Sequence, residues 1–237
     1  MMVPAMRRVS MRISDQADLA LPRLMQLISP SLPIGGYTYS QGIEWAVETG
    51  WINTDQQLRQ WLGGLMQTNL VYLELPILKR MIEAWANDDR DRLDEYNAFL
   101  IASRETLELR LEESNRARAF CELLKSLEPA ALEFQPVLRR TQSACFSFAC
   151  ERWRIEFEEA ASGYLWSWLE NLVMSAIKII PLGQTAGQQV IFDLGAMIPA
   201  TVAAARAIGD AEIGASSMAL AIASTRHETQ YTRLFRS

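Results

Sequence analysis

The segment that decides the fold class is GYLWSWLENLVMSAIKII, residues 163–180. At about 100° per residue, a helix over this segment gathers its apolar side chains on one broad face. These side chains are Leu165, Trp168, Leu169, Leu172, Val173 and Ala176. The opposite side carries a narrow polar stripe of Ser167, Asn171, Met174 and Lys178. We predict a core helix that ends at Pro181-Leu182-Gly183, with a stripe that fits either a solvent face or an interface with another helix or subunit.

Apolar side chains recur at three- and four-residue spacings on both sides of this segment, whereas strand signals are scarce. The sequence therefore predicts an all-α fold, a single-domain helical bundle of about ten helices over residues 21–237, after a flexible N-terminal segment at 1–20. At 153–157, helix or loop is favoured over a short strand. Helices are expected at 22–28, at 41–49, from 54 with a restart or kink at Pro76, at 88–127 as two helices, at 142–151, at 184–208 with a kink or break at Pro199, and from 215 onward.

The composition excludes several classes of protein. Of the 237 residues, 23 are Lys or Arg and 28 are Asp or Glu, and the net charge of −5 disfavours a nucleic-acid binder. No stretch approaches about 18 uninterrupted apolar residues, so a membrane-spanning helix is not expected. Residues 1–20 lack the apolar segment of a secretory signal, and three cysteines are too few for a disulfide framework. We expect free thiols and a cytoplasmic protein.

Residues suited to catalysis or metal binding are sparse. His227 is the one histidine, and a capping or interface role is favoured over a metal or acid–base role. Cys145 and Cys150 would lie on different faces of a helix, which favours buried thiols over metal ligands. An independent helical enzyme is therefore the weaker hypothesis. A charged helix face that we expect to meet solvent contains Glu105, Glu108, Glu112 and Glu113 with Arg104, Arg110, Arg116 and Arg118.

Two further segments are unusual. The Gly35-Gly36 pair predicts a turn that needs a positive φ, or an exposed loop that displays Tyr37 and Tyr39. No Gly-Lys-Ser/Thr follows the pair, so it is not a nucleotide site. The ending at 226–237 suits docking onto an acidic surface as well as it suits a free terminus, because it mixes arginines with Tyr231, Leu234 and Phe235.

Three segments together resemble the UreF family of urease accessory proteins. They are LMQLISPSLPIGGYTYSQGIE at 24–44, the helix and turn at 163–184, and RHETQYTRLFRS at 226–237. The charged segment from Arg104 to Leu111 is also similar to a mid-chain motif of the family. Residues 129–160 match more loosely, and Tyr37-Thr38 stands where many relatives have Phe-Ser. The resemblance spans the chain and is carried chiefly by the opening loop and the ending.

The resemblance implies a UreF-like all-α fold, a homodimer and a chaperone role in urease maturation, without an enzymatic reaction. It implies binding to UreD (UreH in some lineages) and recruitment of the GTPase UreG, which carries nickel to apo-urease. Nickel would be the delivered ion, with no tightly bound cofactor and no metal site on this chain. Nucleic acid and membrane are not expected partners.

The resemblance also implies roles for particular residues. Tyr37 and Arg233 match positions that contact the GTPase or order that surface, and Lys178 matches a lysine implicated in regulating activation. An alternative is that Arg233 acts in trans on the GTP site of the partner. The partner-binding residues implied in this way are Gly35, Gly36, Tyr37, Tyr39, Glu44, Lys178, Arg226, His227, Glu228, Tyr231, Arg233, Leu234 and Phe235.

Overall fold

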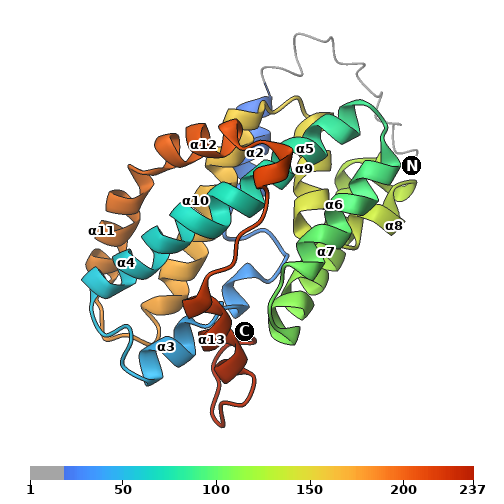
Figure 1. The fold of residues 1–237 in the computed structure, drawn as a ribbon. Coiled ribbons are helices and arrows are strands. Elements are labelled where there is room, and N and C mark those ends of the chain that lie inside the picture. Colours follow the sequence, from blue (N-terminus) through green and yellow to red (C-terminus); the bar gives the residue numbers. More distant parts are fainter. Residues whose placement is uncertain (1–18) are drawn as a thin grey trace, which may run out of the picture.

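The computed structural model of the chain describes residues 19–237, so the predicted flexible segment at 1–20 lies almost wholly outside the described residues. Residues 19–237 form helices joined by loops and contain no strand, which confirms the all-α class. Figure 1 shows the helices packed side by side, with the chain ending near α3 and α13. Trp153 to Phe157, where apolar and charged residues alternate, is a turn that leads into a helix.

Among the first helices, α4 begins at a local capping signal. Thr54 and Gln57 form a capping box, in which the Thr54 hydroxyl accepts the Gln57 N–H at 3.2 Å. Pro76 occupies the first turn of α5, where a missing N–H is tolerated, and a π-helical stretch precedes it. The elements in this part of the chain are α2 Ala20–Ile28, α3 Ile43–Glu48, α4 Asp55–Leu65, the π-helix Met66–Glu74 and α5 Leu75–Ala86.

The middle of the chain contains the two helices predicted between 88 and 127. Asp89 caps the first by accepting the Arg92 N–H at 3.1 Å, and Thr106 caps the second by accepting the Leu109 N–H at 3.3 Å. Thr141 caps the helix that follows the proline-bracketed connector. The elements are α6 Arg90–Ala102, α7 Leu107–Leu127, α8 Gln135–Leu138 and α9 Gln142–Arg152.

The apolar segment at 163–180 belongs to a longer helix, α10 Phe157–Ala176, which begins earlier and ends earlier than predicted. Residues 177–179 continue as turns, so Lys178 lies just beyond the helix. Leu165, Leu169 and Val173 of the predicted core face are fully buried, whereas Trp168 is only half-buried. The face prediction is therefore confirmed apart from one residue.

The last helices are α11 Gln184–Gly195, α12 Ile198–Ala207 and α13 Met218–His227. The predicted break near Pro199 falls at Ala196 and Met197, with the proline in the first turn of α12. Gln184–Ala207 is long and apolar enough to cross a membrane by length and composition alone, contrary to our expectation, although 39% of its apolar window is buried inside the protein. In this fold it is divided between α11 and α12, which pack on α4, α10 and the π-helix.

One continuous hydrophobic core joins these helices. At its centre, the Trp85 ring meets the Phe148 ring edge-on at 5.1 Å, and the Trp85 indole N–H donates to Ser147 Oγ at 3.0 Å. The three cysteines are buried and unpaired, as expected for thiols. This core fixes α7 and α10, the two helices that carry the site described next.

Candidate docking site

The Gly-Gly loop lies against the polar stripe of α10. Gly35 has a φ of 72°, as the turn prediction requires. Gly36 is needed for another reason: a Cβ built on it would stand 3.3 Å from the Asn171 side chain. The Ser175 hydroxyl donates to the Tyr39 carbonyl oxygen at 3.2 Å. The middle of the stripe is therefore an internal interface with a loop of the same chain.

The C-terminal segment folds back onto this loop. The Arg236 N–H donates to the Thr38 carbonyl oxygen at 2.9 Å. The Ser237 carbonyl oxygen accepts the Ser40 N–H at 2.8 Å and the Ser40 hydroxyl at 2.6 Å. Residues 233–237, here called the tail, thus pair with residues 38–40 in the part of the molecule near α3 and α13 (Figure 1).

Two carboxylates, of buried Glu44 and half-buried Glu108, hold the tail and α13 together. Glu44 of α3 accepts the Leu234 N–H at 2.6 Å and the Phe235 N–H at 2.9 Å. Glu108 of α7 accepts the Arg233 guanidinium at 2.5 Å. The ring of His227, which is fully buried, lies between Glu44 and Glu108. The acidic surface on which the tail docks is therefore on its own chain.

Lys178 contacts both the loop and the tail. Its ammonium lies 5.9 Å from the centre of the Tyr37 ring and 5.7 Å from the centre of the Phe235 ring. Both distances are within the range of a cation–π interaction. Three segments that are far apart in the sequence thus meet around one cation.

The structure divides the predicted partner-binding residues into an exposed set and a buried set. The Tyr37 ring is 58% exposed, and the exposed set also contains Lys178, Arg226, Tyr231, Arg233 and Leu234. Tyr39, Glu44, His227 and Phe235 are buried beneath them. Glu228 is half-buried and accepts the Glu108 N–H at 3.0 Å, which caps the start of α7. Gly36 is buried and Gly35 half-buried, so both serve the shape of the loop.

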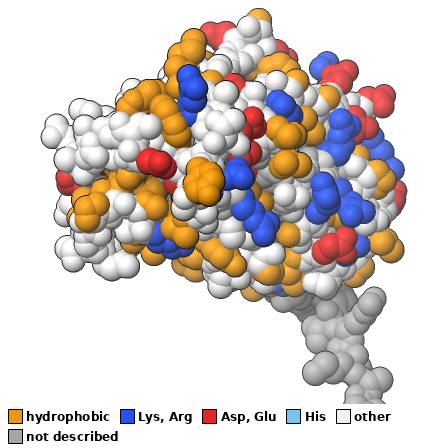
Figure 2. Space-filling model, turned by 90° about the horizontal axis from the view of Figure 1, so that it is seen from below, with side chains coloured by type: hydrophobic (Ala, Val, Ile, Leu, Met, Phe, Trp, Pro, Cys, Tyr) orange, Lys and Arg blue, Asp and Glu red, His pale blue; other side chains and the backbone are white. Residues whose placement is uncertain are grey.

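Figure 2 views the molecule from below Figure 1, the side on which the chain ends. Hydrophobic side chains are spread over this face, and Lys and Arg side chains gather in the half of the view that corresponds to α7 in Figure 1. Asp and Glu side chains lie among them, so this face carries apolar groups and charges of both signs.

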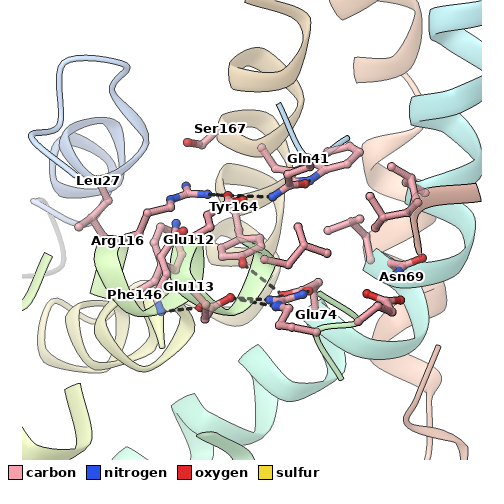
Figure 3. A pocket seen from close by; sticks show the side chains of 18 residues that line it. Leu27, Gln41, Asn69, Glu74, Glu112, Glu113, Arg116, Phe146, Tyr164 and Ser167 are labelled. Carbon is pink, nitrogen blue, oxygen red and sulfur yellow. Dashed lines mark hydrogen bonds and ion pairs between the residues drawn. The ribbon is translucent and has the colours of Figure 1, made fainter. Parts of the chain in front are cut away.

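The charged face of α7 is not the solvent face that the sequence predicts. Glu112 and Glu113 are only 4% and 7% exposed, because both pair with cations inside the protein. The Arg104 guanidinium bridges Glu113, at 2.6 Å, and Glu74 at the end of the π-helix. Figure 3 shows Glu74, Glu113 and Tyr164 gathered in this interior cluster. The prediction of a solvent face was wrong for Glu112 and Glu113, because arginines of the same chain neutralise these two carboxylates inside the protein.

A second pair adjoins the first. Glu112 accepts Arg116 at 3.0 Å, the Gln41 side-chain amide at 3.0 Å and the Ser237 hydroxyl at 2.9 Å. Figure 3 shows Gln41, Glu112 and Arg116 converging at one side of a cavity of about 60 Å³. The interior cluster is thus connected to the tail through Glu112.

The electrostatics of the interior cluster follow from burial and from the facing charges. Burial disfavours the charged guanidinium of Arg104, but the carboxylates of Glu74 and Glu113 outweigh it and hold the pKa of Arg104 well above its ordinary value. Burial, followed by the nearby carboxylates, raises the pKa of the Tyr164 hydroxyl. Arg104 is therefore a permanent cation, and Tyr164 stays neutral.

Side chains suited to nucleophilic or metal chemistry are scarce in residues 19–237. Burial raises the pKa of the Cys150 thiol and of Cys145, so both stay protonated and unreactive. No group of three or more His, Cys, Asp or Glu side chains able to hold a metal ion occurs within residues 19–237.

Sequence reasoning missed two residues on which the site depends. Glu108 was assigned to a solvent face, although it binds both His227 and Arg233. Ser237 was treated as part of a docking ending, although it is fully buried. A signal for Glu108 existed in its spacing of four residues from Glu112, which places both carboxylates on one side of α7. No local signal identifies Ser237.

The family model and the related proteins that match this chain all point to the same family. The family model described as UreF matches residues 52–195. A urease accessory protein UreF from Alcanivorax borkumensis is 49% identical over 91% of this chain and 97% of its own length. Proteins of the same name from Azoarcus sp. and from Pseudomonas putida (strain W619) are 46% and 45% identical, over 92% and 93% of this chain and 96% and 99% of their own lengths.

Proposed function

Because the chain belongs to the UreF family of urease accessory proteins, we propose that it is a scaffold in urease maturation. In this proposal a dimer of the chain binds UreD (UreH) in the cytoplasm and recruits the GTPase UreG, which brings nickel for insertion into apo-urease. Nickel is the cargo of the assembly, and this chain performs no reaction of its own.

The observation that carries the proposal is the meeting of three segments at Lys178. Tyr37 comes from the loop, Phe235 from the tail, and Lys178 from the end of the α10 stripe, and the two rings flank one ammonium. Arg233 is 41% exposed on the same tail and is fixed by Glu108. Partly exposed aromatic and arginine side chains held in place by a rigid support are typical of binding hot spots.

The support for a scaffold also comes from what the buried residues do. Glu44 binds the tail through Leu234, and His227 binds Glu44. The Arg104 guanidinium donates to Glu74 and Glu113. These hydrogen bonds fix the shape of the surface above them. The exposed residues above them supply the contacts in our proposal.

The test is co-purification of the full chain with UreD and UreG, followed by size determination of the complex. We expect wild type to form an assembly that contains two copies of this chain. Tyr37→Ala should weaken it, whereas Tyr72→Ala, at an exposed tyrosine of the π-helix, should not. A monomer that ignores both partners, or one that turns over a metabolite alone, would contradict the proposal.

A further inference from the structure

His227 occupies a site in which both ring nitrogens face carboxylate oxygens. Its Nδ1 lies 2.6 Å from Glu108 Oε2, and its Nε2 lies 3.1 Å from Glu44 Oε2. The side chain has no exposure to solvent. Both contacts are hydrogen-bond distances, so each of the two pairs of atoms must share a proton.

The surroundings of the two carboxylates favour their ionised forms. Glu44 accepts two backbone N–H groups of the tail, from Leu234 at Oε1 and from Phe235 at Oε2. Glu108 accepts the permanently charged Arg233 guanidinium at its other oxygen, Oε1. Hydrogen bonds donated to a carboxylate stabilise its charged form. The two shared protons therefore belong to the ring.

A neutral imidazole cannot satisfy this geometry, because it has one N–H and one lone pair. In either tautomer, the lone pair would point at a carboxylate oxygen at hydrogen-bond distance. We propose that His227 is held as an imidazolium that donates to Glu44 and Glu108 at once. It is a positioning residue that fixes the tail, and its consequence for partner binding rests on the proposed function.

The charges around the ring balance in this state. Glu44 faces it from α3, Glu108 from α7, and Arg233 reaches Glu108 from the tail. Two negative and two positive charges then share the hydrogen bonds of the ring and of Arg233. A third carboxylate nearby, that of Glu228, accepts the Glu108 backbone N–H instead of a hydrogen bond from the ring. A charge-balanced, fully hydrogen-bonded cluster is the arrangement in which buried ions are tolerated.

The imidazolium links three segments at the point where the tail begins. α13 ends at His227, and the tail returns so that Leu234 and Phe235 bind the carboxylate that the ring also binds. Without the positive ring, Glu44 and Glu108 would face each other across the site with no cation between them, and Arg233 would remain on the far oxygen of Glu108. The tail would then lose its fixed position, and Phe235 would leave Lys178.

The decisive experiment uses the fact that the sequence contains a single histidine. The full chain, without a histidine tag, is labelled with ¹⁵N-histidine, and its ring nitrogens are observed by NMR at pH 8, where a freely exposed imidazole is almost entirely neutral. We expect both nitrogens to appear as protonated nitrogens, each with an attached proton. One nitrogen with the shift of an unprotonated position would overturn the proposal.

A second measurement tests the positioning role without any partner. Hydrogen exchange of the Leu234 and Phe235 amides is compared in wild type, His227→Gln and Thr225→Ala, the last being an exposed position on α13. We expect protection of both amides to fall at least about tenfold in His227→Gln alone, because charged hydrogen bonds are lost there. Unchanged protection would contradict the role. If His227→Gln does not fold, the wild-type ring spectrum still decides the proposal.

The two proposals fail separately. If the ring is an imidazolium and the His227→Gln tail is released, but assembly with UreD and UreG is unchanged, the proposed function of the tail fails while the inference about His227 stands. If the ring is neutral, the inference fails whatever the partners do.

Discussion

Two polar clusters meet on α7, and they use the same chemistry in different settings. The interior cluster, Arg104 with Glu74 and Glu113, lies among helices of the core and borders a cavity. The tail cluster, His227 and Arg233 with Glu44 and Glu108, fixes residues at the end of the sequence. Each surrounds carboxylates with cations supplied by the chain itself.

The difference lies in what can move when a partner is removed. Arg104 is held by elements that cannot separate without unfolding, so a carboxylate that loses it stays buried and uncompensated. The tail is short, and its release would let water reach Glu44 and Glu108. Buried charge therefore supports stability in the first region, and the placement of an exposed surface in the second.

Removal of Arg104 should cause the largest loss of folding stability. A small loss would mean that the two clusters do not differ in the way described. Arg104→Ala leaves Glu74 and Glu113 unpaired, so we expect a loss of about 3–5 kcal/mol in the free energy of unfolding. Urea denaturation measures it. Arg118→Ala, at an exposed position on α7, is the control and should leave stability unchanged. Equal stability of the two variants would mean that the interior cluster is not needed for the fold.

Removal of Glu44 should have an intermediate effect. Glu44→Ala deletes the acceptor of two tail N–H groups and of His227, and we expect a loss of about 1–3 kcal/mol because the tail can detach. Hydrogen exchange should show the loss confined to the tail and α13, with core amides still protected. Glu95→Ala, at an exposed ion pair on α6, serves as the control. A uniform loss of protection throughout the core would show that Glu44, like the interior cluster, supports the stability of the whole fold.

Arg233→Ala should separate stability from function. The Arg233 side chain is 41% exposed, so its ion pair with Glu108 should change stability by less than about 1 kcal/mol. Assembly with UreG should nevertheless weaken by about tenfold or more if Arg233 is a hot spot.

GTP turnover by UreG at saturating Arg233→Ala distinguishes docking from an arginine acting in trans. Turnover should equal that with wild type if the residue only docks, and should stay low if it enters the GTP site. A large drop in melting temperature would contradict the exposed role that we assign to Arg233.

Lys178→Ala should destabilise the protein only modestly. It deletes two cation–π contacts, each worth about 0.5–1 kcal/mol at exposed sites. We expect the dimer to persist and the matured urease to contain less nickel, measured by metal analysis after co-expression. Lys178→Arg keeps a cation between the rings and should restore most of the nickel content. An unchanged nickel content in urease matured with Lys178→Ala would show that the α10 stripe has no role in activation.

The fold was largely predictable because its signals are local. Thr54 with Gln57, Asp89 and Thr106 each cap a helix within a few residues of themselves, and α10 carries its core face in its own spacing. The ends of α10 were misplaced because the turns after Ala176 keep the apolar pattern of the helix. Periodicity reports which face is buried and says little about where the backbone stops being helical.

The site was predictable only in part because its contacts are long-range. His227 and Glu44 are 183 positions apart, and neither residue has a pattern that points to the other. The glutamates of α7 alternate with arginines in a way typical of a solvent face, and only the fold reveals that α9 and the tail cover Glu113 and Glu112. The resemblance of the ending to the family named these residues as candidates, and their division into exposed and buried sets needed the structure.

The return of the tail has a consequence for how the protein is made. The Ser237 carbonyl oxygen binds Ser40, 197 positions earlier, so the loop that displays Tyr37 stays unclosed until residues 233–237 have left the ribosome. A nascent chain whose helices have already condensed still lacks that surface. In the function proposed above, the surface that meets the partners is therefore completed only after the helices have packed.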